Sequence, residues 1–131
     1  MTAQNGAAAD PGFAADEIAK SNLLLEAQLL RARRQTDEAA VKFARAARLE
    51  ERLGAACLEN GLRADAWVHR FSAASCWAQA GNFHEAITLG EELLGQPDLA
   101  PGLREQIREY TSALRRKRGT FRATSRPSWV S

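Results

Sequence analysis

The stretch that decides the fold is Ala66–Leu94, AWVHRFSAASCWAQAGNFHEAITLGEELL. Apolar residues recur at three- or four-residue intervals on both sides of Ala80-Gly81-Asn82, which is typical of two amphipathic helices joined by a tight turn. Asn82 and Glu85 are expected to form a capping box at the start of the second helix. The helix before the turn carries two tryptophans with small residues between them, a pattern that favours close antiparallel packing. This stretch therefore predicts a helical hairpin.

Helical spacing continues in both directions from this hairpin. Three further helices are expected, over residues 14–34, over residues 37–59 and from Pro101 onwards. Thr36 is expected to cap the second of these helices and Asn60-Gly61 to end it. Alanine is abundant and β-branched residues are sparse, which also favours helix. The prediction is an all-α fold of about five helices.

The 131 residues suffice for one domain with a real core. We expect a disordered leader over 1–13, a helical domain over 14–118 and a basic flexible tail over 119–131. Asp10 and Pro11 leave open a helical turn inside the leader, with Asp10 as its cap. No stretch resembles a signal peptide or a membrane span, which predicts a cytoplasmic protein.

Charge is distributed unevenly although the net charge is only +2. Residues 115–126 hold six cations and no acid, so the rest of the chain is net acidic. Residues 45–52, in the middle of the second helix, are predicted to form a solvated face with weak ion pairs. Cys57 and Cys76 lack metal-binding or redox spacing and are predicted to be small buried residues.

No arrangement of residues predicts catalysis. His69 and His84 have no neighbours at the spacing of a triad or a metal site. The adjacent acids Glu50-Glu51 and Glu91-Glu92 point about 100° apart on a helix, so they do not make an acid–base pair. The sequence therefore predicts a protein that is not an enzyme, with no catalytic residue, no metal site and no cofactor.

Residues 67–94 resemble a tetratricopeptide repeat (TPR). The resemblance is carried by Ala73-Ala74, Trp77, Gly81-Asn82-Phe83 and Glu85-Ala86, while Arg70 and Gly90 depart from the motif by replacing its usual opening Trp and a later aromatic. A weaker copy precedes it, with its turn at Gln35. The resemblance implies TPR-like antiparallel hairpins stacked right-handed with a C-terminal capping helix. A generic helical bundle is the alternative.

TPR proteins hold partners in a concave groove, so the resemblance implies an adaptor or small assembly subunit. The partner would be another protein, offering a helix or an extended peptide, and a homo-oligomer is also open. The positions matching the groove, offered as partner-binding residues, are Asn22, Leu25, Leu29, Arg33, Phe71, Ser75 and Gln79. The alternative is that Leu25, Leu29 and Phe71 fill the core.

The basic tail is a second candidate site. Its contact residues would be Arg115, Arg116, Arg118, Arg122 and Trp129. The cations are suited to neutralising phosphates and Trp129 to stacking on bases, which predicts a nucleic-acid-associated accessory protein as the alternative function. Docking of Trp129 into a protein partner and a purely solubilising tail stay open as well.

Overall fold

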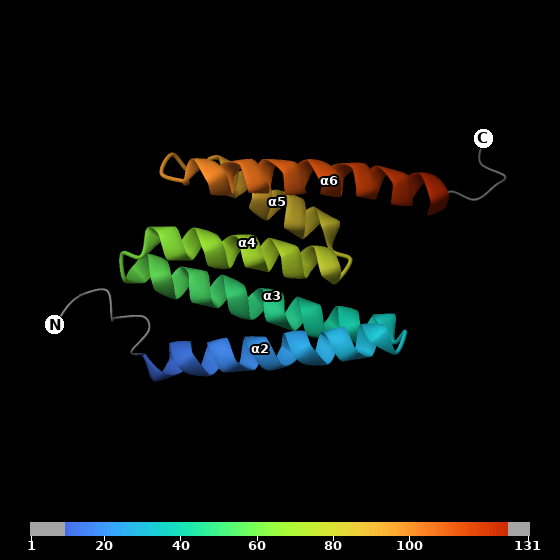
Figure 1. The fold of residues 1–131 in the computed structure, drawn as a ribbon, viewed down its shortest axis with the longest axis horizontal. Coiled ribbons are helices and arrows are strands. Elements are labelled where there is room, and N and C mark those ends of the chain that lie inside the picture. The colour runs from blue at the N-terminus through green and yellow to red at the C-terminus, as the bar shows by residue number, and fades with distance from the viewer. Residues whose placement is uncertain (1–9, 126–131) are drawn as a thin grey trace.

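A computed structural model describes residues 10–125 of the chain, and side chains within residues 10–120. This part is all-α and contains five helices. The helices are α2 (Pro11–Ala32), α3 (Thr36–Glu59), α4 (Arg63–Gln79), α5 (Phe83–Leu94) and α6 (Pro101–Ser125). Each helix packs mainly against the next one along the chain. Figure 1 shows the result as a layered stack, with α2 along one edge and α6 along the other.

Three tight turns reverse the chain between α2 and α5. Each turn contains one residue with positive φ, namely Arg34 (62°), Gly61 (74°) and Gly81 (87°). The residue that follows each of them donates its N–H to a carbonyl in the last turn of the preceding helix, at 2.8–2.9 Å. This left-handed helix ending favours glycine, which has no Cβ to clash with the backbone. The predicted stops at Asn60-Gly61 and Gly81 are confirmed.

Small residues let the helices approach one another. Ala27, Ala46, Ala66 and Ala73 are fully buried at the contacts between neighbouring helices, while larger side chains such as Phe43 fill the spaces beside them. Burial of these apolar side chains is the main stabilising term, at about 25 cal/mol for each Å² removed from water. The predicted burial of Cys57 and Cys76 is confirmed.

The first helix begins earlier than predicted. It starts at Pro11 instead of residue 14, and Asp10 caps it by accepting a hydrogen bond from Gly12 N at 2.8 Å. Phe13 is buried, with its ring edge-to-face against His69 at 5.9 Å. The leader predicted over 1–13 therefore ends at least three residues too late, because Phe13 belongs to the core. Its residues 1–9 lie outside the described part.

The last helix continues further than predicted. It runs through residue 118 to Ser125, so at least residues 119–125 of the predicted flexible tail are helical. Gly119 does not interrupt it, since one glycine inside a helix costs only about 1 kcal/mol. Residues 126–131 lie outside the described part.

Two predicted caps are also wrong. Thr36 is the first residue of α3 and Gln35 occupies the cap position, where its side chain makes no capping hydrogen bond. Asn82 does occupy the cap position of α5, but its side chain makes no capping hydrogen bond either. The residues at these two cap positions, Gln35 and Asn82, directly follow the positive-φ residues Arg34 and Gly81, so turn geometry fixes these helix starts.

Candidate functional site: a groove between α2, α4 and α6

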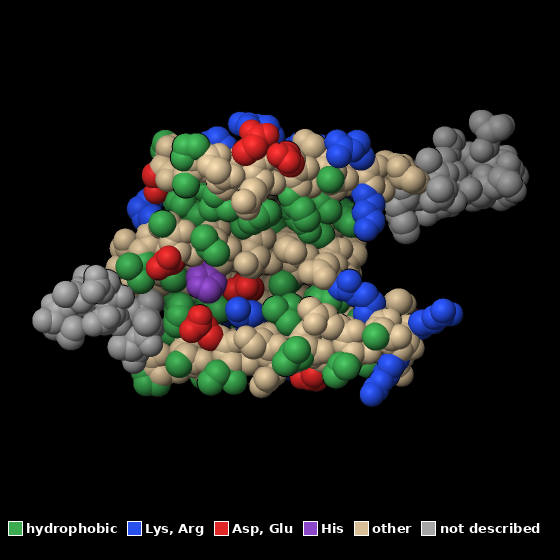
Figure 2. Space-filling model, viewed as in Figure 1, with side chains coloured by type: hydrophobic (Ala, Val, Ile, Leu, Met, Phe, Trp, Pro, Cys, Tyr) green, Lys and Arg blue, Asp and Glu red, His purple; other side chains and the backbone are tan. Residues whose placement is uncertain are grey.

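A recess with an apolar floor and a polar rim is lined by residues from the ends of α2, α3 and α4 and from α6. It measures about 440 Å³, and its inner surface includes Ala39, Phe43, Ala78 and Leu114. Figure 2 shows hydrophobic side chains gathered in the band between α4 and α6. Alanines line the recess because their short side chains leave space between helices that longer ones would fill. We call this recess the α4–α6 groove.

Polar and aromatic side chains surround the α4–α6 groove. Arg31 at the end of α2 and Lys117 on α6 provide positive charge on opposite sides. Phe83 and Tyr110 add aromatic surface, and the Tyr110 ring lies edge-to-face on Phe71 at 5.5 Å. An apolar floor with a cationic rim suits a partner segment that carries apolar side chains beside an acidic group.

Arg31 connects the two helices on one side of the groove. Its guanidinium donates a hydrogen bond to Gln79 Oε1 at 2.6 Å and lies over the Phe43 ring, 4.5 Å from the centroid. Gln79 is also within 3.4 Å of Ser75 Oγ. The last turn of α2 is thereby attached to the last turn of α4, which fixes one wall of the groove.

The structure brings three of the predicted partner-binding residues together. Gln79 lines the groove, Ser75 hydrogen-bonds to Gln79, and the partly buried Phe71 contacts Tyr110, which also lines it. These three residues lie on α4, the helix with the clearer TPR resemblance. The sequence missed Arg31, Tyr110 and Lys117. Arg31 lies on α2, where the weaker copy of the repeat assigned the groove to other positions, and Tyr110 and Lys117 lie on α6, which was predicted to be a capping helix.

The four predicted residues at or beside α2 do not line this groove. Asn22 lines a separate recess of about 550 Å³ with Arg45 and Arg48, and Leu29 and Arg33 border another with Glu38 and Lys42. Leu25 and Leu29 are exposed, so the alternative that they fill the core is wrong.

The orientation of α2 explains this difference. Ala27, which is fully buried, and Leu23 face the core, so residues on the opposite side of the helix face solvent. The spacing Leu23, Ala27, Arg31 marks the inward face in the sequence. Leu24 and Leu30 flank that face, and Leu25 and Leu29 lie on the opposite side of the helix. Because leucines occur all around α2, apolar periodicity alone assigned its inward face wrongly.

The predicted tail contacts are spread around α6. Arg115 pairs with Glu91, Arg116 is exposed and Arg118 is half-buried. Arg118 lies within about 60° of Arg115 around the helix, whereas Arg116 points about 100° away from Arg115, so the three cations are not aligned on one line along α6. The backbone of Arg122 is helical, whereas its side chain and Trp129 lie outside the described residues.

A buried polar cluster joins α2, α3 and α4. Glu50 is 3% exposed, and its carboxylate lies 2.8 Å from His69 Nδ1 and 3.7 Å from Lys20 Nζ. Nearby, Trp77 Nε1 donates to Glu51 Oε2 at 2.7 Å. The prediction that residues 45–52 form a solvated face is therefore wrong for Glu50 and Glu51. Lys20 and His69 come from other helices, so only the tertiary structure could place them beside Glu50.

Outside this cluster, the described cysteine, histidine and acidic side chains provide little reactive or metal-binding chemistry. Burial raises the pKa of the Cys76 thiol to about 11, and Glu50 contributes further. Cys76 is thus a poor nucleophile at neutral pH. Within the described residues, no three His, Cys, Asp or Glu side chains are grouped to hold a metal ion. None of the described helices combines the length and apolar character needed to cross a membrane.

Comparison of the chain with protein-family models, with curated proteins and with solved structures gives no match in any of the three.

Proposed function

We propose that this chain is a non-catalytic adaptor or small assembly subunit that binds a segment of another protein in the α4–α6 groove. The observation that supports this most is the recess of about 440 Å³ with its alanine-rich floor and its rim of Arg31, Gln79 and Lys117. The TPR resemblance of residues 67–94 supports a hairpin-repeat adaptor. The stacking of each helix on its neighbour along the chain is consistent with it.

Affinity would come from burying apolar side chains of the partner against Phe83, Tyr110 and Leu114. Because the groove walls are packed helices, little conformational entropy is lost on binding. Arg31 and Lys117 would orient the partner by pairing with an acidic side chain, since no described acidic residue lines the groove. The expected partner segment is a short helix or an extended peptide that carries apolar side chains and an acidic side chain.

The test fills the groove without disturbing the core. Ala113 lines the groove and is exposed, so Ala113→Arg adds bulk to it, whereas Ala64→Arg makes the matched change at the opposite end of α4. We expect proteins captured from the native host to bind the wild type and Ala64→Arg but at least about tenfold less of them to bind Ala113→Arg. Equal capture by all three chains would overturn the proposal.

The second candidate is a nucleic-acid-associated accessory protein acting through the basic end of α6. The observation that favours it is the run Arg115, Arg116, Lys117 and Arg118, which lies near the end of the stack. We rank this function second because the four cationic side chains point in different directions around the helix. A gel shift distinguishes the two functions, because phosphate binding weakens steeply with salt and would be lost when Arg115, Arg116, Lys117 and Arg118 are replaced by glutamine.

A further inference from the structure

The outward face of α2 carries an apolar stripe that no other described helix covers. Ile18, Leu25 and Leu29 are 63%, 61% and 58% exposed. Their spacing of seven and then four residues places them on one line along the helix, and the exposed residues Ala14 and Ala32 lie close to that line at its two ends. Large apolar side chains aligned in this way are unusual on a surface that stays in water.

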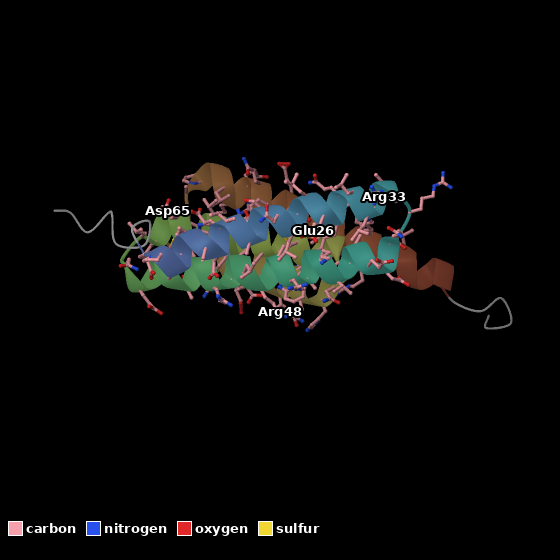
Figure 3. All side chains as sticks on the ribbon, turned by 90° about the horizontal axis from the view of Figure 1, so that it is seen from below. Glu26, Arg33, Arg48 and Asp65 are labelled. Carbon is pink, nitrogen blue, oxygen red and sulfur yellow. The ribbon has the colours of Figure 1, made fainter. Side chains whose placement is uncertain are left out.

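The two outer helices of the stack, α2 and α6, differ in the polarity of their outward faces. Figure 3, seen from the α2 side, shows α2 and α3 side by side at this end, with Arg33 at the end of α2. At the other end, the exposed residues of α6 include Glu105, Arg108, Glu109 and Arg116. A terminal helix of a helical stack needs such a polar outer face to remain soluble. The α6 end has one, whereas the α2 end presents the apolar stripe.

Charge along α2 indicates what covers the stripe. The acids Asp10 and Glu17 lie at its beginning, and Arg33 and Arg34 lie at its end. Two copies of α2 paired antiparallel would place the acidic end of each beside the basic end of the other. Parallel pairing would place arginines beside arginines, which is unfavourable. Antiparallel helices also align their dipoles favourably.

We propose that two copies of this chain associate through antiparallel α2 helices, with Ile18 of one copy against Leu29 of the other and Leu25 near the two-fold axis. Because the chain pairs with itself, the same patch is used on both copies. The stripe and the α4–α6 groove lie on different sides of α2, so the dimer leaves the groove open. This proposal does not depend on the proposed function.

The size of the contact sets the expected affinity. A helix of 22 residues is about 33 Å long, and one pair of such helices buries less than the roughly 1,200 Å² of a standard stable interface. We therefore expect a reversible dimer whose population rises with protein concentration, with a Kd of roughly 10 μM to 1 mM.

Sedimentation equilibrium of the full chain over that concentration range tests the association. We expect Leu25→Glu with Leu29→Glu to weaken dimerisation at least tenfold, and circular dichroism to show an unchanged fold because both side chains are exposed. Val68→Glu, at an equally exposed valine on α4, is the control and should leave the dimer intact. A wild-type chain that stays monomeric, or a dimer unaffected by the double substitution, would overturn the proposal.

Cross-linking tests the orientation. In the antiparallel pair, a mixture of Ile18→Cys and Leu29→Cys chains forms disulfide-linked heterodimers, while either variant alone links far less. Positions 18 and 29 are about 16 Å apart along one helix. In the antiparallel pair, position 29 of one copy is therefore about 16 Å from position 29 of the other, which is too far for a disulfide. Cys57 and Cys76 are buried and do not compete. Efficient linking of Leu29→Cys to itself would overturn the antiparallel arrangement.

Discussion

Gly90 of α5 lies directly against Thr111 of α6, so closely that a Cβ at position 90 would be 2.4 Å from Thr111 Oγ1. Thr111 is fully buried by this contact. The TPR-like pattern has an aromatic residue where Gly90 stands, and the glycine instead allows α6 to pack onto α5. The position of α6, and with it one wall of the α4–α6 groove, depends on this pair.

Gly90→Ala is expected to destabilise the fold by about 1–3 kcal/mol, because the added methyl group overpacks the α5–α6 contact by more than the helix propensity of alanine can offset. Urea denaturation measures the free energy of unfolding. Gly102→Ala is the control, since nothing lies within 4 Å of a Cβ there. In the Thr111→Ala background the cost of Gly90→Ala should fall sharply; an unchanged cost would show that the two positions do not contact each other.

Arg34→Gly is expected to stabilise the protein by up to about 1 kcal/mol. Arg34 has φ of 62°, the left-handed conformation that Gly61 and Gly81 adopt in the other two turns. A residue with a Cβ is strained there, and relief of that strain outweighs the added chain entropy of glycine in the unfolded state.

Arg33→Gly provides the contrast, because Arg33 has φ of −89° and gains nothing from glycine. This neighbouring substitution should destabilise the chain by about 0.5–1 kcal/mol. Thermal unfolding of both variants tests the sign, and equal shifts in Tm would contradict the assignment of strain to position 34.

Glu50→Ala is expected to lower the free energy of unfolding by about 3 kcal/mol, since it leaves Lys20 and His69 without their buried partner. Chemical denaturation near neutral pH measures the loss. Glu59→Ala, at an exposed site on the same helix, should stay within about 0.5 kcal/mol of the wild type. Similar effects at both positions would show that the cluster contributes no more than a surface acid.

Asp98 is expected to make the stability depend on acid pH. Hydrogen bonds from Arg63 Nε at 2.8 Å and from Trp67 Nε1 at 3.2 Å lower the pKa of Asp98 from 3.8 to about 2. The ionised form is favoured in the folded state, so its contribution is complete above the unfolded-state pKa and is lost as pH falls toward 2.

The measurement compares wild type with Asp98→Asn by denaturation at several values between pH 5 and pH 2. The stability difference should shrink across that interval. In an Arg63→Ala background the same comparison should be nearly flat, because Arg63 is the main cause of the shifted pKa. A difference that is constant with pH in both backgrounds would contradict this account.

Local signals in the sequence determined the helices and most of their ends. Helical periodicity located all five, and Gly61, Gly81 and Pro101 marked turns and starts that the structure confirms. These features depend on backbone conformation and near-neighbour spacing, which a single chain segment already contains. Asp10 and Pro11 also carried the signal of the early start of α2, although the predicted leader did not use it.

Contacts between distant residues were decided only in the tertiary structure. Nothing local distinguishes Glu50 from Glu59, because the burial of Glu50 comes from Lys20 and His69 on other helices. The inward face of α2 was likewise set by where Ala27 fits against α3, since leucines flank it on either side. Apolar periodicity alone allows more than one face of a helix to be buried. Packing decides which face is buried, because close contact between two helices requires a small side chain at one particular position.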